Sequence, residues 1–164
     1  MGFIFLRHSN RHKNDLTIEK SLNRVGKYNA NICLKGKLKE LNISEIYCSP
    51  FLTCLQTIDN FSSEQNIPIK IEACLTETLK EQDLKKIDYN LLTKDEYFEM
   101  ISKFKIDNNY LPVYSMNNLL SKNYSVLNET LLERMELFTD FLNNCKNDDK
   151  NILIVSHSSI LNNL

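Results

Sequence analysis

The stretch Phe3-Ile4-Phe5-Leu6-Arg7-His8-Ser9-Asn10-Arg11 decides how the rest of the chain is interpreted. Its first four residues are apolar and favour a β-strand, which ends where the charged residues begin. In open α/β sheets, ligands bind at the carboxyl ends of the strands. Guanidinium groups bind phosphate oxygens in a fork, and an imidazole can act as a nucleophile or carry protons. The stretch therefore predicts an anion pocket built from Arg7, His8 and Arg11.

Length and composition indicate one globular domain. The chain has 164 residues, of which 42% are hydrophobic and 25% charged, which is enough to bury one full core. A net charge of -1 and a pI near 6.3 give no general attraction to nucleic acid or to an anionic membrane. We therefore expect no nucleic-acid partner and no membrane attachment, so that phosphate chemistry depends on local arginines. Nothing in the sequence indicates the oligomeric state.

The cysteines and the amino terminus favour a cytoplasmic protein. The five cysteines are scattered, and none forms a C-x-x-C pair, so we expect reduced thiols with neither disulfides nor a zinc site. The first apolar run is only four residues long and ends at Arg7, which is unlike a signal peptide. No apolar stretch approaches the roughly 18 residues that a membrane span needs.

Strand and helix patterns alternate along the chain, which predicts a three-layer α/β/α sandwich with a mostly parallel central sheet. Ser49 is expected to cap the second major helix, with Pro50 at its first position. The signals weaken between about 78 and 127, where we expect a poorly defined insertion in a single domain that spans 1–164. The expected strands are 3–6, 43–48, 69–71 and 151–156, and the expected helices are 35–41, 51–65, 93–104, 116–120, one after Asn128, and 158–164.

Two of the three histidines directly follow apolar strands at opposite ends of the sequence. In a parallel sheet the ends of these strands lie on one edge, so His8 and His157 meet if the strands are neighbours. The alternative is that each histidine is simply a polar residue at a strand terminus. The arginines beside His8 favour the shared site.

Four motifs in this order resemble those of the histidine phosphatase superfamily, also called phosphoglycerate mutase-like. The family's strand ending Arg-His-Gly corresponds to Phe5-Leu6-Arg7-His8-Ser9, and Arg11 keeps the spacing of one phosphatase branch. Its Ser-Pro-x-x-Arg-x-x-Gln-Thr motif corresponds to Ser49-Pro50-Phe51-Leu52-Thr53-Cys54-Leu55-Gln56-Thr57, in which Thr53 replaces the arginine. Its Leu-x-Glu and Val-Ser-His-Gly motifs correspond to Leu75-Thr76-Glu77 and Val155-Ser156-His157-Ser158.

The resemblance covers nearly the whole chain and implies a phosphoglycerate mutase-like fold and a role for each motif residue. His8 would be the nucleophile that forms a phosphohistidine. Arg7, Arg11 and His157 would bind the phosphoryl oxygens and neutralise their charge. Glu77 would protonate the leaving oxygen and then activate water. No metal or other cofactor is expected, because the arginines supply the positive charge. The substrate would be a phosphorylated small molecule or a phosphoprotein, and hydrolysis is favoured over mutase chemistry.

Thr53, at a phosphate-binding position, leaves two functions open. It lacks the charge and the paired donors of an arginine, and the loss of one such donor costs on the order of 10²–10³ in rate. Either the enzyme is active but slow, with a lysine or Arg24 filling the gap, or the protein binds phosphorylated ligands with hardly any turnover. A two-histidine phosphodiesterase on another fold is a third reading of His157-Ser158-Ser159, but Asn10 argues against it.

The sequence also leaves two assignments open near the site. The general acid could be Glu72, Glu77 or Glu81, because all three lie in the same polar stretch. Arg134, within the helix after Asn128, is expected to make a structural ion pair or to lie in solvent.

Overall fold

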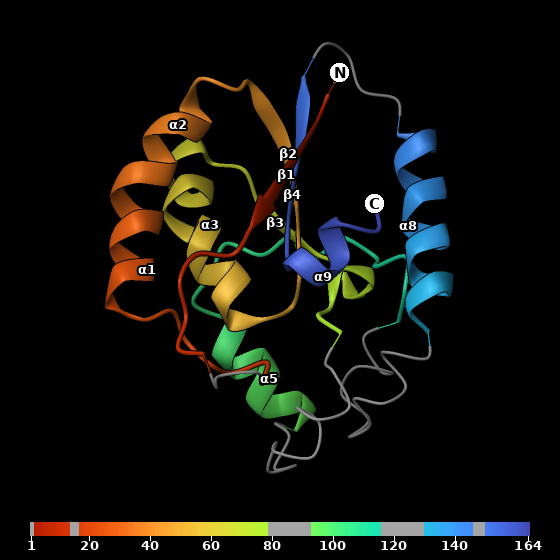
Figure 1. The fold of residues 1–164 in the computed structure, drawn as a ribbon, viewed down its shortest axis with the longest axis horizontal. Helices are drawn as coiled ribbons and strands as arrows, with labels where there is room; N and C mark the ends of the chain where they lie inside the picture. The colour runs from red at the N-terminus through yellow and green to blue at the C-terminus, as the bar shows by residue number, and fades with distance from the viewer. Residues whose placement is uncertain (1, 14–16, 79–92, 116–129, 146–149) are drawn as a thin grey trace.

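A computed structural model describes residues 2–13, 17–78, 93–115, 130–145 and 150–164. Its centre is a four-stranded parallel sheet with the strand order β1-β4-β2-β3 (Figure 1). The predicted α/β architecture with a parallel sheet is confirmed. The strands are β1 (Phe3–Arg7), β2 (Ile43–Cys48), β3 (Ile69–Ile71) and β4 (Asn151–Ser156).

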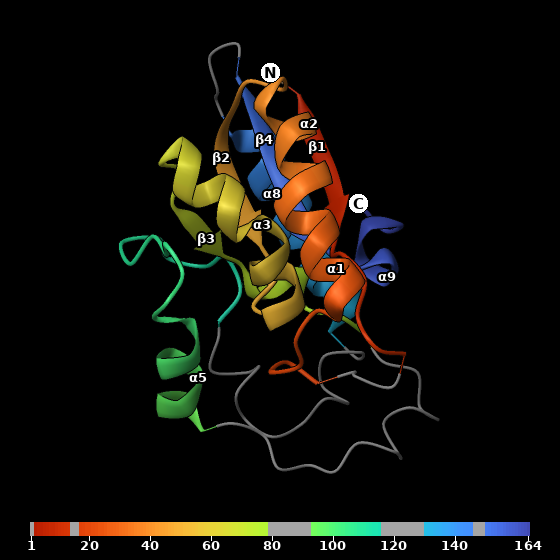
Figure 2. The ribbon, with the colours of Figure 1, turned by 90° about the vertical axis from the view of Figure 1, so that its left-hand side faces the viewer.

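Helices cover both faces of the sheet (Figure 1). On one face lie α1 (Arg24–Tyr28), η1 (Asn29–Leu34), α2 (Lys35–Lys39) and α3 (Leu52–Gln65), and on the other lies α8 (Leu131–Asn144). The short turn η2 (Ala73–Leu75) follows β3, and α9 (Ser158–Leu161) follows β4. Figure 2 shows α5 (Lys94–Ile101) beyond the carboxyl ends of the strands.

Strand β4 is central, and its side chains divide the core into two clusters. Leu153 and Val155 pack on the side of α3, whereas Ile152 and Ile154 pack on the side of α8. All four are fully buried, as expected for a parallel strand with helices on both faces. The same alternation directs the side chains at the end of β4 to opposite sides of the sheet.

The predicted start of one helix and the predicted end of another differ from the structure by one to three residues. The helix expected at 51–65 begins at Leu52, and its cap is Phe51 rather than Ser49. Ser49 is still held by the sheet, because its backbone N–H donates to the carbonyl of Val155 at 2.9 Å. The helix expected at 158–164 ends at Leu161, and its cap is His157.

Much of the predicted insertion, including Glu81 and the helix expected at 116–120, lies outside the described residues, and so does Asn128. Its described part begins with Thr93, whose side chain and Glu96 form a capping box that starts α5. In the described part of the chain, no helix is both long and apolar enough to cross a membrane.

Candidate active site

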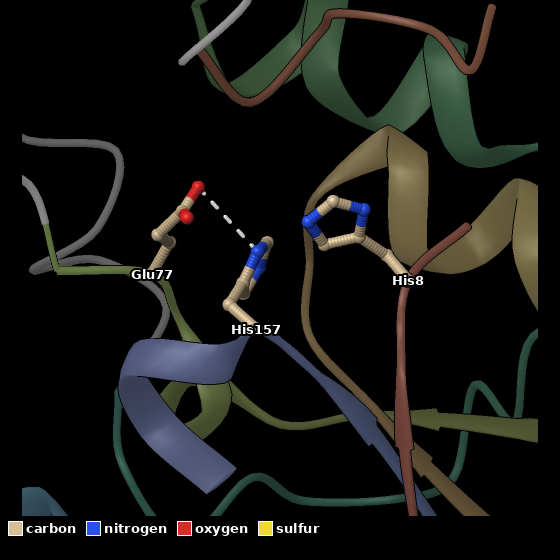
Figure 3. A group of neighbouring side chains, drawn as sticks. All are labelled: His8, Glu77 and His157. Atoms are coloured by element: carbon tan, nitrogen blue, oxygen red, sulfur yellow. Dashed lines mark ion pairs between the residues drawn. The ribbon is translucent and has the colours of Figure 1, made fainter. Parts of the chain in front are cut away.

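The pairing of β1 with β4 brings His8 and His157 together. Arg7 lies opposite Ser156 in the register, and the backbone N–H of His8 donates to the carbonyl of Ser156 at 2.9 Å. The two imidazole centroids are 5.1 Å apart, and Glu77 lies beside them (Figure 3). Both histidines are buried, with 7% and 0% of their surface exposed. The carboxyl edge of the sheet therefore carries one site rather than two separate polar ends.

The hydrogen bond of His8 fixes which ring nitrogen can react. Nδ1 lies 2.7 Å from the carbonyl oxygen of Ser9, and because a carbonyl only accepts, Nδ1 carries the proton. Nε2 then keeps its lone pair; it is buried, has no hydrogen-bond partner among the described residues, and points toward His157 (Figure 3). Burial is the main cause that lowers the pKa of His8 to about 4, with smaller contributions from Arg11 and Arg7. The ring is therefore neutral near pH 7, as a nucleophile requires.

His157 is held between Ser49 and Glu77. Its Nε2 lies 3.0 Å from the Ser49 hydroxyl, and its Nδ1 lies 3.4 Å from Glu77 Oε2. Burial, followed by His8 and the two arginines, holds the pKa of His157 well below its usual value. With the proton of the neutral ring on Nδ1, which faces the Glu77 carboxyl group, Nε2 accepts from the hydroxyl of Ser49.

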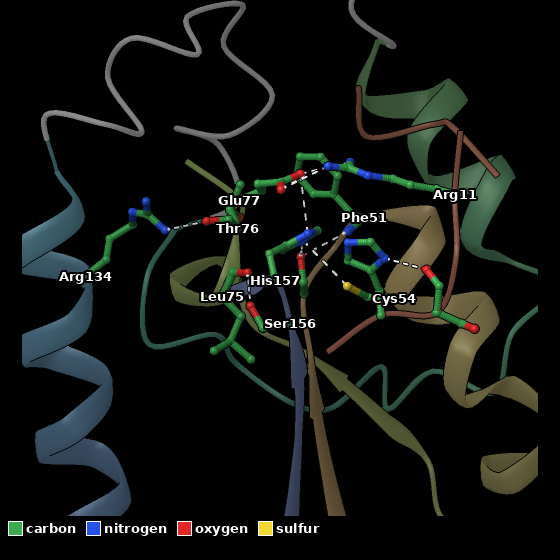
Figure 4. A network of polar contacts seen from close by, with 12 residues as sticks. Arg11, Phe51, Cys54, Leu75, Thr76, Glu77, Arg134, Ser156 and His157 are labelled. Carbon is green, nitrogen blue, oxygen red and sulfur yellow. Dashed lines mark hydrogen bonds and ion pairs between the residues drawn. The ribbon is translucent and has the colours of Figure 1, made fainter. Parts of the chain in front are cut away.

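Arg11 and Glu77 form a two-pronged ion pair beside the histidines (Figure 4). Arg11 Nη1 lies 2.9 Å from Glu77 Oε2, and Nη2 donates to Oε1 at 3.0 Å. Only 13% and 12% of these side chains are exposed, so the pair is shielded from water. Charge-assisted forks of this kind are among the stronger polar contacts in proteins. An incoming anion must therefore share Arg11 with Glu77 or displace the Glu77 carboxylate from Arg11.

Glu72, the second described candidate for the general acid, has a structural role. Its carboxylate is fully buried and accepts hydrogen bonds from the N–H of Cys74 at 2.9 Å, the hydroxyl of Tyr110 at 2.7 Å and the N–H of Val113 at 2.8 Å. These bonds hold the segment after α5 against the end of β3. Glu77 is therefore the described candidate that lies beside the histidines.

The positive charge of the site comes from its first loop. Arg7 is exposed at the end of β1 and lowers the pKa of both histidines, which places it within electrostatic reach of them. Thr53 is 1% exposed in the first turn of α3, one residue before Cys54, whose Sγ lies 3.5 Å from His157 Nε2. Arg24 is exposed and makes no hydrogen bond or ion pair with any described residue, so it does not fill the place of the missing arginine.

Three residues of the second motif, none of which was expected in the site, contact the residues or loops that form it. Ser49 contacts His157, as described above. The hydroxyl of Thr57 accepts from the N–H of Ser9 at 2.9 Å and donates to the carbonyl of Thr53 at 2.7 Å. Gln56 accepts from the hydroxyl of Ser21 and from the N–H of Leu22 at 2.9 and 2.8 Å. The only signal for these roles was the motif in which all three occur.

His8, Glu77 and His157 are also the described residues that could hold a metal ion, since one ligand atom of each lies within 4.8 Å of the others. Two neutral imidazoles and a carboxylate suit zinc, whose tetrahedral ligand atoms lie about 3.4 Å apart. Arg11 already occupies both carboxylate oxygens, however, and its charge opposes a cation. The balance of charge therefore favours an anion at this place.

The comparisons with known proteins agree with the fold. The family model described as histidine phosphatase superfamily (branch 1) matches residues 3–164. The chain is 30% identical over 129 residues to "Ubiquitin-associated and SH3 domain-containing protein A" of Homo sapiens, covering 74% of this chain. It is 30% identical over 146 residues to "Ecdysteroid-phosphate phosphatase" of Drosophila melanogaster, covering 85% of this chain. The chain spans 18% of the length of each of these relatives.

Solved structures show the same fold at lower identity. The ecdysone phosphate phosphatase of Bombix mori, solved with tungstate, superposes with a TM-score of 0.64 at 17% identity. The match covers 98% of this chain and 74% of that one.

Proposed function

The chain belongs to branch 1 of the histidine phosphatase superfamily, and from this premise we propose that it is a metal-independent phosphomonoester hydrolase that acts through a phosphohistidine on His8. One observation carries the proposal: a buried, neutral imidazole has a free Nε2 beside Arg11, Glu77 and His157. This arrangement combines a nucleophile, an anion-binding group and a proton donor within one site.

In the first step, the Nε2 lone pair of His8 attacks phosphorus while the bond from phosphorus to the leaving oxygen breaks. Arg7, Arg11 and His157 bind the three equatorial oxygens, where the charge of the transition state is spread. For this step the phosphate displaces Glu77 from Arg11, and Glu77 in its protonated form gives its proton to the leaving oxygen. The hydrogen bond from Nδ1 to the Ser9 carbonyl stabilises the positive charge that develops on the ring.

In the second step, water attacks the phosphohistidine. The ionised Glu77 takes a proton from the water, the bond from phosphorus to Nε2 breaks, and inorganic phosphate leaves. The ring of His8 recovers its lone pair, and Glu77 is again protonated, so the cycle closes without another reactant.

Substitution of His8 tests the proposal. We expect His8→Ala to reduce hydrolysis of p-nitrophenyl phosphate by at least about 10³-fold, because the covalent route is lost. His12→Ala is the matched control, since His12 is exposed four residues further along, and we expect it to keep wild-type activity. Acid-labile, alkali-stable phosphate on the quenched wild type, absent from His8→Ala, would identify the phosphohistidine. Equal rates for wild type and His8→Ala would refute the mechanism.

A second function, binding of phosphorylated ligands with little turnover, is favoured by Thr53 and by the engagement of Arg11 with Glu77. For either function we propose a phosphorylated small molecule as the ligand, the class that the name of the Drosophila relative indicates for that protein. A phosphoprotein is the alternative. A single domain and a cytoplasmic location are part of the same proposal; the five described thiols are all free, as that location requires.

A further inference from the structure

The segment that carries Glu77 is held by side chains from two distant parts of the chain. Arg134 Nη1 donates to the carbonyls of Cys74 and Thr76 at 2.7 and 3.2 Å. The hydroxyl of Ser156 donates to the carbonyl of Leu75 at 2.8 Å (Figure 4). Each of the three successive carbonyls before Glu77 is therefore bonded to a buried side chain.

Of the two alternatives for Arg134, exposure to solvent is wrong, because its surface is 0% exposed. It lies on the face of α8 that packs against η2, next to Met135 and one turn before Phe138. Burial of a guanidinium is costly, and an apolar residue of similar size would suit a core position better. The contacts that offset this cost include the two carbonyls that flank Leu75, so the burial of Arg134 is linked to the segment leading to Glu77.

Ser156 connects the same segment to the second histidine. It is the last residue of β4, and its side chain points to the α8 side of the sheet, whereas the next side chain, His157, packs against Phe51 on the other side. A single strand end therefore fixes both the backbone before Glu77 and the imidazole that Glu77 faces.

We propose that Arg134 and Ser156 are positioning residues that set the place of the Glu77 carboxylate relative to His157 and to the leaving oxygen. The inference rests on the proposed function, in which Glu77 is the general acid. A proton donor must lie within hydrogen-bond reach of the leaving oxygen, and a displacement of about 1 Å costs on the order of 10²-fold in rate. Loss of the carbonyl contacts would loosen the segment without removing the carboxylate itself.

Dependence on the leaving group separates this role from a merely structural one. Nitrophenolate leaves without full protonation, whereas an alkoxide needs the acid. We expect Glu77→Gln to slow hydrolysis of glycerol phosphate by about 10²-fold more than that of p-nitrophenyl phosphate. Arg134→Met keeps an apolar stem but no donor. It should slow hydrolysis of glycerol phosphate about tenfold more than that of p-nitrophenyl phosphate. Arg134→Lys, which retains one donor group, should recover part of the loss, and Ser156→Ala should show a weaker bias.

Met135→Ala is the matched control, because it removes a buried side chain from the neighbouring position of α8 without touching the carbonyls. It should lower the melting temperature and affect both substrates equally. An Arg134→Met variant that behaves like Met135→Ala, with no bias between substrates, would overturn the inference.

An NMR measurement keeps the inference testable if the wild type proves inert, an outcome that would refute the proposed function alone. The ¹⁵N shifts of the His157 ring report the carboxylate 3.4 Å from its Nδ1, and the chain has only three histidines to assign. We expect Glu77→Gln and Arg134→Met to move these shifts in the same direction, and Met135→Ala to leave them in place. Unchanged shifts in Arg134→Met would show that Arg134 does not position Glu77.

Discussion

At the level of single residues, Thr53 determines how much positive charge the site holds. Arg7 and Arg11 are the described arginines beside the histidines, and Arg11 is already paired with Glu77. A threonine is uncharged and cannot bind two phosphate oxygens through a fork. We therefore expect turnover slower than a third arginine would allow.

Substitution of Thr53 by arginine should increase activity. We expect Thr53→Arg to raise kcat/KM for p-nitrophenyl phosphate by on the order of 10²-fold, the reverse of the usual cost of losing one such donor. The site is tight, because Thr53 is 1% exposed, so the longer side chain should cost about 1–3 kcal/mol of stability. Thr53→Met adds comparable length without charge, so it should lower the stability by a similar amount without raising kcat/KM. A folded Thr53→Arg variant with unchanged kcat/KM would contradict this assignment of the position.

At the level of elements, helix α3 organises the loop that carries the nucleophile. Thr57, in its second turn, bonds the N–H of Ser9, and the carbonyl of Ser9 in turn fixes the proton on His8 Nδ1. Gln56 anchors the residues before α1 in the same way. The first half of α3 therefore holds both ends of the connection between β1 and α1, which lies 34 to 48 residues earlier in the chain.

Removal of the Thr57 hydroxyl should weaken the site through the Ser9 loop. Thr57→Val has nearly the same shape but leaves the N–H of Ser9 without its acceptor, which costs about 1–3 kcal/mol for a buried group. We expect urea denaturation to show that loss and kcat to fall roughly tenfold, because His8 is less well oriented. Thr57→Ser keeps the hydroxyl and should preserve most of the free energy of unfolding and most of kcat. A Thr57→Val variant that is as stable and as active as Thr57→Ser would show that the hydroxyl of Thr57 does not support the site.

At the level of the whole molecule, two buried neutral histidines make stability depend on pH. An unfolded chain protonates histidine near pH 6.5, whereas folded His8 takes a proton only near pH 4. Between these values the unfolded state binds more protons, so the free energy of unfolding falls as the pH falls. His157, whose pKa is also lowered, mainly by burial, acts in the same direction.

Urea denaturation at pH 7.5 and pH 5.0 measures this dependence. From His8 alone we expect a loss of about 2 kcal/mol between the two pH values, which follows from its folded pKa of about 4. His8→Asn should remove about that part of the dependence, and His12→Asn, at an exposed histidine, should leave it unchanged. If the free energy of unfolding depends on pH equally in the wild type and in His8→Asn, His8 is not held neutral in the folded protein.

The sequence alone was sufficient to predict the strands, most of the helices and the candidate site residues. The runs that form β1 and β4, the motif from Ser49 to Thr57 and the glutamate after β3 are local patterns, and local patterns express the preferences of neighbouring residues. They were sufficient to predict a parallel α/β fold, the family resemblance and the candidates His8, Glu77 and His157.

The tertiary structure alone decided how these pieces meet. Three contacts depend on strand order and on helix packing. Arg11 pairs with Glu77, and Ser49 contacts His157 rather than capping α3. Arg134 is buried against the segment before Glu77. The tertiary structure also separated Glu72 from Glu77 as candidates for the general acid, which the sequence could not do because both lie in one polar stretch. The physical reason is that these contacts join residues 58 or more positions apart, and no periodicity within the chain records which distant side chain will occupy a given buried place.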